Sequence, residues 1–359
     1  GQLHGHMDKK LVGRGKARAE VDYFVPFNPA SPQQVLELFH ANGVDTESTG
    51  DKEVSKFADN PIVKKILDYR VAAKRVNTYG LPYLQYVEPD GKIYTSLNIS
   101  QAETGRDSSS SPPLQNILKD LDYRKCFIAG DGRNLVIYDY AGQELNLFAY
   151  VTQDPGLIEI VNSGENAYIR VARTSFNEII IKGTPRYLIM KGLVLGMSYG
   201  LTPYGLARDN DVEQEVADEM FKKFFADFPV AAAWVKDQQR YNRGITKTIL
   251  GRKGGLHPYN AQWKNNALNN PFQGSGGDMI KLAMKEFRKT SLYKENYSTR
   301  DVYMVIQVHD EIIVNCAEHL AKETAEALSG CMNDVANRMH PGIISRVSGG
   351  ICDNWSEKG

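Results

Sequence analysis

The sequence predicts an α+β protein that combines an antiparallel sheet with a separate, mostly helical region. Two observations support this class. The strand-forming runs Tyr303–Val308 and Ile312–Val314 are separated only by a short polar turn, as in a β-hairpin. Long helical patterns are instead grouped at 185–200 and 212–239. At 359 residues the chain exceeds an average domain, so two or three subdomains are expected.

Composition argues against a membrane protein and favours an intracellular one. The chain is 42% hydrophobic and 24% charged, and no apolar run is long enough to cross a bilayer. The 4 cysteines are widely scattered without a CxxC pair, which predicts reduced thiols and no structural zinc. We expect a cytoplasmic or nucleoid-associated protein of bacterial or phage type, or a protein of an organelle. Residues 1–7 resemble a vector-derived extension and are excluded from the fold prediction.

Charge is balanced over the whole chain but segregated along it. Lysine plus arginine total 43, as do aspartate plus glutamate. Basic residues cluster at 9–18, 64–75 and 247–253, and acidic residues cluster at 209–219. Such segregation is typical of a phosphate-lined cleft on a neutral body, although solvated helix faces give the same pattern.

The first third of the chain is predicted to be helical and then to alternate strands with loops. Short helices are expected over 33–78, one of them starting at Ser31–Pro32. Residues 88–97 predict a hairpin with its turn at Pro89–Gly91. The polar, serine-rich stretch 104–111 predicts a loop or a low-complexity linker.

Strand and helix signals continue toward the C-terminus. A buried strand is predicted over Leu135–Tyr138, ending at Asp139, with a helix over 144–150. A turn is expected at 251–255, and a further helix begins at Gly274 or Ser275.

The long apolar helix predicted over 185–200 carries two regular stripes. Lys191, Leu195 and Tyr199 recur every four residues and therefore share one face. Three glycines, Gly192, Gly196 and Gly200, form the second stripe at the same spacing. Each interior glycine costs roughly 1 kcal/mol relative to alanine, so a ligand or a tightly packed neighbouring element must approach this surface closely.

Acidic residues at the ends of two predicted strands are candidates for a metal site. Asp310 and Glu311 follow an apolar strand, where burying ionised acids costs energy unless cations or donors meet them. An exposed acidic turn explains the same residues equally well. Asp139 also ends an apolar strand, and two acids held together by a sheet suit a pair of magnesium ions. Lys191 supplies charge for a triphosphate, and Tyr199 supplies an aromatic face for a base.

These motifs, in their order along the chain, resemble those of family A DNA polymerases. Residues 139–145, DYAGQEL, are similar to the first catalytic motif of the family, DYSQIEL. Residues 191–200 are similar to its finger helix, KxxxFGxxYG, and residues 307–311, QVHDE, match its last motif. Further similarity lies at 104–117, to TGRxSSxxPNLQNI, and at 269–274, to NxPxQG.

The resemblance covers residues 24–357 and implies a right-hand polymerase fold with an antiparallel palm sheet, mostly helical fingers and a partial thumb. The implied parts are a tag and basic segment at 1–23, a thumb remnant and connection at 24–85, palm at 86–155, fingers at 156–265 and palm again at 266–359. Family members normally begin with an exonuclease or related domain and long thumb helices. We therefore expect those portions on the same longer protein or on another chain.

The resemblance also implies roles for individual residues. Asp139, Asp310 and the Tyr140 carbonyl would bind two Mg²⁺ ions, with Mn²⁺ as a substitute, and Glu311 would lie beside the primer end. Glu144 would be a steric gate that favours deoxynucleotides, rather than a surface glutamate of its helix. The implied contacts of the incoming dNTP are Lys191, Glu144, Gln143, Arg186, Tyr187, Leu195, Tyr199 and Tyr168. The implied contacts of primer-template DNA are Arg106, Gln115, Asn116, Asn269, Gln273 and His309.

Several positions depart from the family pattern, and the main ones concern the nucleotide. Tyr187 stands where the family has a phosphate-binding arginine, and Arg186 lies one position away, about 100° around a regular helix. Tyr168 replaces a histidine, Asn146 an arginine, and Leu195 an aromatic residue. The implied metal ligands are unchanged, whereas nucleotide affinity and fidelity cannot be inherited from the family.

The sequence thus predicts a template-directed DNA polymerase, in which a primer 3′-hydroxyl attacks the α-phosphate of a dNTP and releases pyrophosphate. A single-subunit RNA polymerase relative shares the lysine-to-Tyr-Gly helix, but Glu144 argues against it. The other alternative is a DNA-binding module with catalysis weakened by its altered phosphate ligands. The presence of both Asp139 and Asp310 argues against that alternative.

Overall fold

Two units make up the chain, a smaller one over residues 1–92 and a larger one over residues 93–359. The computed structural model describes residues 6–12, 19–118, 121–210, 212–240, 244–257, 259–260 and 262–358, with side chains from residue 26 onward except those of Lys52 and Leu121. The side chains of the predicted basic cluster at 9–18 lie outside this description.

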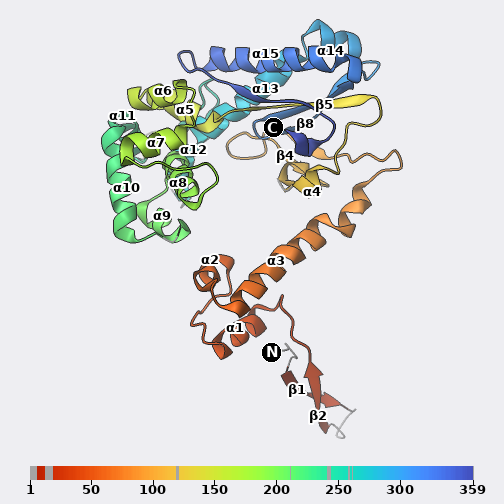
Figure 1. Ribbon diagram of the computed structural model, residues 1–359, viewed down its shortest axis with the longest axis vertical. Coiled ribbons are helices and arrows are strands. Elements are labelled where there is room, and N and C mark those ends of the chain that lie inside the picture. The colour runs from red at the N-terminus through yellow and green to blue at the C-terminus, as the bar shows by residue number, and fades with distance from the viewer. Residues whose placement is uncertain are drawn as a thin grey trace. The chain divides into compact units, whose positions relative to one another are not determined.

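The first unit contains a hairpin and a small helical core (Figure 1). Its strands, β1 (His6–Val12) and β2 (Ala19–Val25), pair antiparallel, although the sequence predicted no strand here. The helices are α1 (Pro32–Ala41), α2 (Asp51–Val54) and α3 (Pro61–Tyr79).

Helix α1 starts as predicted, because the Ser31 hydroxyl accepts a hydrogen bond from the Gln34 amide ahead of Pro32 at the first helical position. The prediction of only short helices is wrong for α3, which runs for 19 residues. The apolar side chains that hold this unit together are Val35, Phe39, Val44, Val54, Val63 and Ile66.

An antiparallel sheet of 4 strands forms the centre of the larger unit. Its spatial order is β10 (Val347–Cys352), β5 (Arg133–Tyr140), β9 (Glu311–Ala317) and β8 (Val302–Val308). The predicted hairpin around residue 309 and the predicted strand before Asp139 are confirmed, while β10 had no sequence prediction. The α+β class is confirmed as well.

Helices cover one face of this sheet. The helices α13 (Ser275–Phe287) and α15 (Ala321–Met339) pack on it, with α14 (Ser291–Asn296) nearby (Figure 1). On β5 and β9, side chains at even positions, such as Val136, Ile312 and Val314, join the apolar core that includes these helices. Because neighbouring side chains on a strand alternate, odd positions point to the opposite face.

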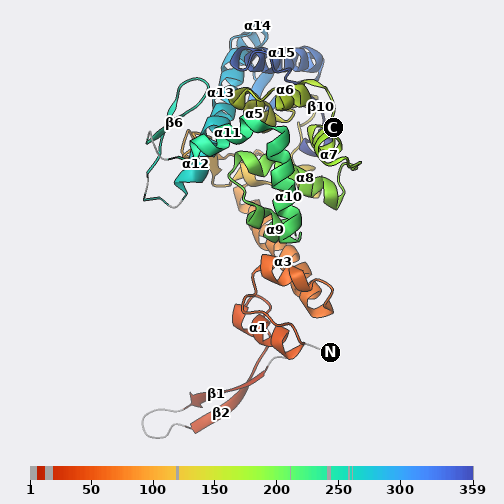
Figure 2. The same ribbon diagram turned by 90° about the vertical axis from the view of Figure 1, so that its left-hand side faces the viewer.

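The helices that follow β5 in the sequence and precede α13 pack together (Figure 2), and their buried side chains join the same apolar core. They are α5 (Gln143–Thr152), α6 (Pro155–Asn162), α7 (Ala167–Phe176), α8 (Pro185–Ser198), α9 (Pro203–Asn210), α10 (Gln214–Asp227), α11 (Pro229–Gln238) and α12 (Trp263–Asn269). The predictions for α5 and α8 are confirmed. The helix predicted over 212–239 is confirmed as two helices, because Pro229 begins the second one directly after the first has ended. In the described part of the chain, no helix combines the length and apolarity that a membrane span requires.

Short elements complete the larger unit: β3 (Ser96–Asn98), β4 (Ser108–Ser110), α4 (Leu121–Arg124), β6 (Ile245–Lys247) and β7 (Lys253–Gly255). The turn at Pro89–Gly91 is present, since the Gly91 amide donates to the Glu88 carbonyl at 2.8 Å. However, β3 pairs with β4, so the predicted serine-rich loop contains a strand.

Candidate active site

The ends of β5 and β9 bring the predicted acids to one edge of the sheet. Asp139 pairs with Glu311 across the ladder, and Asp310 lies in the turn just before β9, where its carbonyl accepts a hydrogen bond from the Tyr140 amide at 3.2 Å. His309 has a φ of 58°, a left-handed conformation that lets the chain reverse between the strands. Alternation along the strands places Asp139 and Glu311 on the face away from α13 and α15. The alternative of an exposed acidic turn does not hold for Glu311, which is 4% exposed.

One ammonium group lies between these carboxylates. The Nζ atom of Lys358 is 2.5 Å from Asp139 Oδ2 and 2.6 Å from Glu311 Oε2. Burial lowers the pKa of Lys358, but the Glu311 and Asp139 carboxylates raise it by more, so the pKa is raised overall. Burial and the nearby charge of Asp139 raise the pKa of Asp310 to about 6. This edge therefore concentrates negative charge and favours bound cations.

The two aspartates fit a divalent metal ion. Carboxylate oxygens are the ligands that Mg²⁺ prefers, and a bound cation would oppose both causes of the raised pKa of Asp310, which are burial and the Asp139 charge. The Lys358 ammonium on Asp139 demonstrates that this carboxylate accepts a cationic partner. Within the described residues, no group of three or more His, Cys, Asp and Glu side chains is arranged around one metal position.

Glu144, in the first turn of α5, belongs to a second polar cluster. Arg106 Nη2 donates to Glu144 Oε1 at 2.9 Å. The Tyr199 hydroxyl is within hydrogen-bonding reach of Glu144 and Gln273, and burial together with the Glu144 charge raises the pKa of Tyr199. Burial, with Glu144 as a smaller contributor, also raises the pKa of Tyr168. Glu144 is thus surrounded by partners, and the interpretation of it as a surface glutamate does not hold.

The start of α8 is regular, and the side chains of Arg186 and Tyr187 have partners within the protein. Thr184 caps the helix through the Tyr187 amide, so Arg186 stays in its regular helical position. Arg186 forms a two-pronged ion pair with Glu178, in which Nε lies 2.6 Å from Oε2 and Nη2 contacts Oε1. Tyr187 is only 7% exposed, and its hydroxyl accepts a hydrogen bond from Asn166 Nδ2 at 3.2 Å. Both residues are therefore engaged within the protein.

Farther along α8, the predicted common face exists. Lys191 is exposed and Leu195 and Tyr199 are partly buried, whereas Met190 and Val194 are buried. Helix α8 packs against α5, which directly follows the strand that carries Asp139.

The glycine stripe of α8 is explained mainly by packing. A Cβ on Gly196 would lie 2.4 Å from Leu201 Cδ2, and one on Gly200 would lie 2.7 Å from Asn265 Oδ1. The nearest atom to a Cβ on Gly192 is 3.8 Å away. The packing alternative therefore holds for two of the three glycines.

Amide side chains support the turn that carries Asp310. Gln115 Nε2 donates to the Gln307 carbonyl at 3.0 Å, and Gln307 Nε2 donates to the His309 carbonyl at 2.9 Å. Gln115 is buried, which makes it a support of the turn in this structure.

The other amide side chains predicted at the site, those of Gln143, Asn116 and Asn269, lie in different surroundings. Gln143 is 4% exposed and donates to Met279 Sδ at 3.7 Å, so it faces α13. Asn116 is exposed. The Oδ1 atom of Asn269 is buried and, within the described structure, has no hydrogen-bond partner.

Sequence reasoning missed residues that lie far along the chain from their partners. Ser348 Oγ donates to Asp139 Oδ1 at 2.6 Å, and Lys358 bridges two acids. Neither belongs to a motif that could have identified it. Arg252 was assigned to a basic cluster suited to phosphate, but its guanidinium donates to the Thr104 carbonyl at 2.6 Å and pairs with Asp278 at 2.8 Å. It therefore ties the 104–111 segment to α13.

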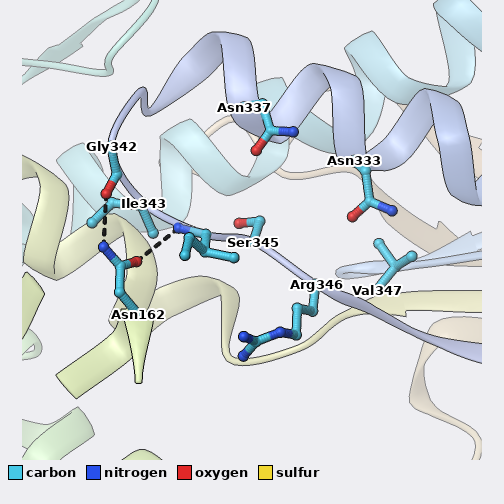
Figure 3. Close-up of a pocket in the computed structure, with 9 residues that line it drawn as sticks. Asn162, Asn333, Asn337, Gly342, Ile343, Ser345, Arg346 and Val347 are labelled. Carbon is cyan, nitrogen blue, oxygen red and sulfur yellow. Dashed lines mark hydrogen bonds between the residues drawn. The ribbon is translucent and has the colours of Figure 1, made fainter. Parts of the chain in front are cut away.

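A cavity of about 640 Å³ is lined by nine residues (Figure 3). It lies next to the acidic edge, by which we mean Asp139, Asp310 and Glu311, because Ser348 follows the lining residue Val347 and bonds to Asp139. Arg346 and Val347 line it just before Ser348, and the Arg346 carbonyl accepts a hydrogen bond from the Ala141 amide at 2.9 Å. Asn162 joins the far wall by donating to the Gly342 carbonyl at 2.8 Å. None of the predicted site residues lines this cavity, so it is separate from the acid pair.

The fold is that of a polymerase domain. The structure resembles a solved structure described as the POL domain of Pol1 from M. smegmatis in complex with DNA primer-template and dNTP, with a TM-score of 0.81 and 28% sequence identity. The match covers 93% of this chain and 62% of that one. The right-hand polymerase fold inferred from the sequence is thereby confirmed.

Curated relatives agree with the structural match. The chain is 30% identical to the thermostable DNA polymerase I of Thermus aquaticus, over 94% of this chain and 43% of the relative. It is 33% identical to DNA polymerase I of Mycobacterium tuberculosis, over 80% of this chain and 33% of the relative. The chain thus spans less than half the length of these relatives.

The family model for DNA polymerase family A matches residues 5–357. The chain belongs to DNA polymerase family A, a family of metal-dependent enzymes.

Proposed function

We propose that this chain is a DNA-directed DNA polymerase that adds dNTPs to a primer on a template strand. The primer 3′-hydroxyl attacks the α-phosphate, and pyrophosphate leaves. The observation that carries this proposal is the placement of Asp139 and Asp310 at the ends of neighbouring segments of one sheet, on a chain of family A. Its setting would be intracellular, on DNA.

Asp139, Asp310 and the Tyr140 carbonyl would hold two Mg²⁺ ions, or Mn²⁺ in their place. Bound metal would lower the pKa of the attacking hydroxyl and stabilise the charge on the leaving pyrophosphate. Glu311, buried beside Asp139, would fix the geometry next to the primer end.

The nucleotide would lie along the exposed face of α8. Lys191 would pair with its phosphates and Tyr199 would pack near the templating base. Glu144 is held by Arg106 at 2.9 Å and would crowd the sugar 2′ position. Arg186, Tyr187 and Gln143 would have indirect roles, since all three are engaged within the protein.

Primer-template DNA would contact Arg106, Gln273, Asn116, Asn269 and His309, with Gln115 in support. In this proposal the thumb remnant is 24–85, the palm 86–155 with 266–359, and the fingers 156–265. An exonuclease or thumb portion would belong to the same longer protein or to another chain.

The test is Mg²⁺-dependent primer extension by Asp139→Asn and Asp310→Asn. Each variant should lose activity on the order of a thousandfold, because it removes a metal ligand. Asp131→Asn, which removes an exposed carboxylate just ahead of β5, is the matched control and should retain activity. Retained extension in either active-site variant would refute the assignment.

A second candidate is a DNA-binding module with weakened catalysis. The specific observation in its favour is that Arg186 and Tyr187 are both occupied by internal partners. Salt-sensitive binding of primer-template without any extension by the unaltered chain, tested also in a version that carries a whole thumb, would favour this candidate.

A further inference from the structure

The C-terminal segment carries Lys358 into the acidic edge of the sheet. Its Nζ atom contacts Asp139 Oδ2 at 2.5 Å and Glu311 Oε2 at 2.6 Å. The Lys358 side chain is 16% exposed. An ammonium group this well shielded from water is stable only because two carboxylates pair with it.

The position of Lys358 is fixed by its neighbours. Trp355 is 3% exposed, and its Nε1 donates to Glu311 Oε1 at 2.7 Å. The indole packs edge-on against Phe127 at 5.5 Å between ring centroids, and the Arg124 guanidinium lies 4.3 Å from the ring. Lys358 therefore extends from an anchored segment.

The two carboxylates that share Lys358 are not equivalent. Glu311 is 5% exposed in its side chain, bonds to Trp355 as well as Lys358, and has Arg124 3.9 Å away. Asp139 is 25% exposed and has Ser348 as its other partner, at 2.6 Å. The ammonium is thus held more firmly on the Glu311 side, and the Asp139 contact is the one open to exchange.

We propose that Lys358 is the resident counter-ion of Asp139 and competes with divalent metal for that carboxylate, an inference that rests on the metal-binding role proposed for Asp139. A dication and an ammonium on one carboxylate repel each other, so metal binding requires Lys358 to withdraw toward Glu311. Lys358 is a positioning residue in this scheme. It keeps the acids paired before metal arrives and sets the metal concentration at which the site fills.

The test is direct Mn²⁺ binding, followed by electron paramagnetic resonance on the 359-residue chain without DNA or nucleotide. Lys358→Met should bind Mn²⁺ about tenfold more tightly, because it removes a positive charge a few ångströms from the ion. Lys358→Arg keeps that charge and should bind like the unaltered chain. Lys322→Met, which removes an exposed lysine on α15, is the matched control and should change nothing. Equal or weaker binding by Lys358→Met would overturn the inference.

Two further measurements keep the outcome clear. If Asp139→Asn leaves Mn²⁺ binding unchanged, both the metal-binding role of Asp139 and this inference fail. If Asp139→Asn abolishes binding while Lys358→Met has no effect, only the inference fails. Circular dichroism checks that each variant is folded. If Lys358→Met is unfolded, the double variant Lys358→Met with Glu311→Gln is measured instead, because it removes both charges of the buried pair. Its Mn²⁺ binding is then compared with that of Glu311→Gln alone.

Discussion

The acidic edge of the sheet and the start of α8 handle charge in different ways. At the edge, strand pairing fixes Asp139 against Glu311, and Lys358 bridges the two. At the start of α8, Arg186 is paired with Glu178 and Tyr187 is buried. The edge keeps the acids that the family motif requires, whereas the helix start uses its side chains for packing. Under the proposed function, catalytic chemistry and nucleotide selection would therefore depend on two separate parts of this chain.

Among the tests of this comparison, the largest expected effect distinguishes Lys191 from the residues at the start of the same helix. Lys191→Ala should lower kcat/KM for dNTPs about 100-fold, because a charged contact to phosphate is lost. Lys182→Ala, which removes an exposed lysine just ahead of α8, should be nearly neutral. Steady-state primer extension measures both variants. Equal effects would mean that Lys191 acts only through general surface charge.

Asp310, at the acidic edge, should make the free energy of unfolding depend on pH. Burial and the Asp139 charge raise the pKa of Asp310 in the folded chain to about 6 from an ordinary value of 3.8. The folded chain therefore favours the protonated form, and its stability falls as the pH rises between these values. With metal removed by a chelator, Asp310→Asn should be more stable than the unaltered chain by roughly 2 kcal/mol above pH 7, and the gain should vanish near pH 4. Urea unfolding at several pH values measures it. Asp334→Asn, on an exposed part of α15, is the control, and a pH-independent gain for Asp310→Asn would contradict the explanation.

The polar cluster around Glu144 should control sugar choice. Glu144→Ala should raise ribonucleotide incorporation relative to deoxynucleotide incorporation by about tenfold, since it opens space at the 2′ position. Glu144→Gln keeps the size of the side chain and should retain most of the discrimination. Competition assays with both nucleotide classes provide the measurement. If Glu144→Ala does not gain ribonucleotide use, Glu144 is not a steric gate, and it no longer argues against a relationship to RNA polymerases.

The smallest effect is expected at Arg186. Because the guanidinium is occupied by Glu178, Arg186→Ala should change kcat/KM for dNTPs by less than about threefold. Glu178→Gln removes the other charge of the same ion pair, and it should also have only a small effect on kcat/KM for dNTPs. A loss as large as that of Lys191→Ala would show that the ion pair opens during catalysis and that the start of α8 takes part in phosphate binding.

Local sequence predicted the fold best where pattern and turn chemistry agree. The hairpin around His309 and the strand before Asp139 followed from apolar runs that end in polar residues. Strand β10 was missed because Val347–Cys352 contains two glycines, which weaken the strand pattern. The helical pattern over 212–239 is confirmed as α10 and α11, and Pro229 divides the two helices.

The acidic residues of the candidate site could be predicted from the sequence motifs, but the residues that contact them could not. Asp139 and Asp310 could be paired from the sequence, whereas Lys358 and Ser348 meet Asp139 only because of the sheet order. No local pattern encodes such a contact. Likewise, Gln143 and Arg186 occupy motif-like positions, and only the packed structure places them against Met279 and Glu178.

The order β10-β5-β9-β8 places both acid-bearing segments on interior strands, paired on each side. A one-residue slip of β5 would turn Asp139 into the helix-packed core, so the register cannot drift without losing the sheet. Backbone amides of Val136 and Ile137 should therefore exchange with deuterium only through global unfolding, among the slowest in the chain. The geometry of the acids would in this way be protected by the full folding free energy.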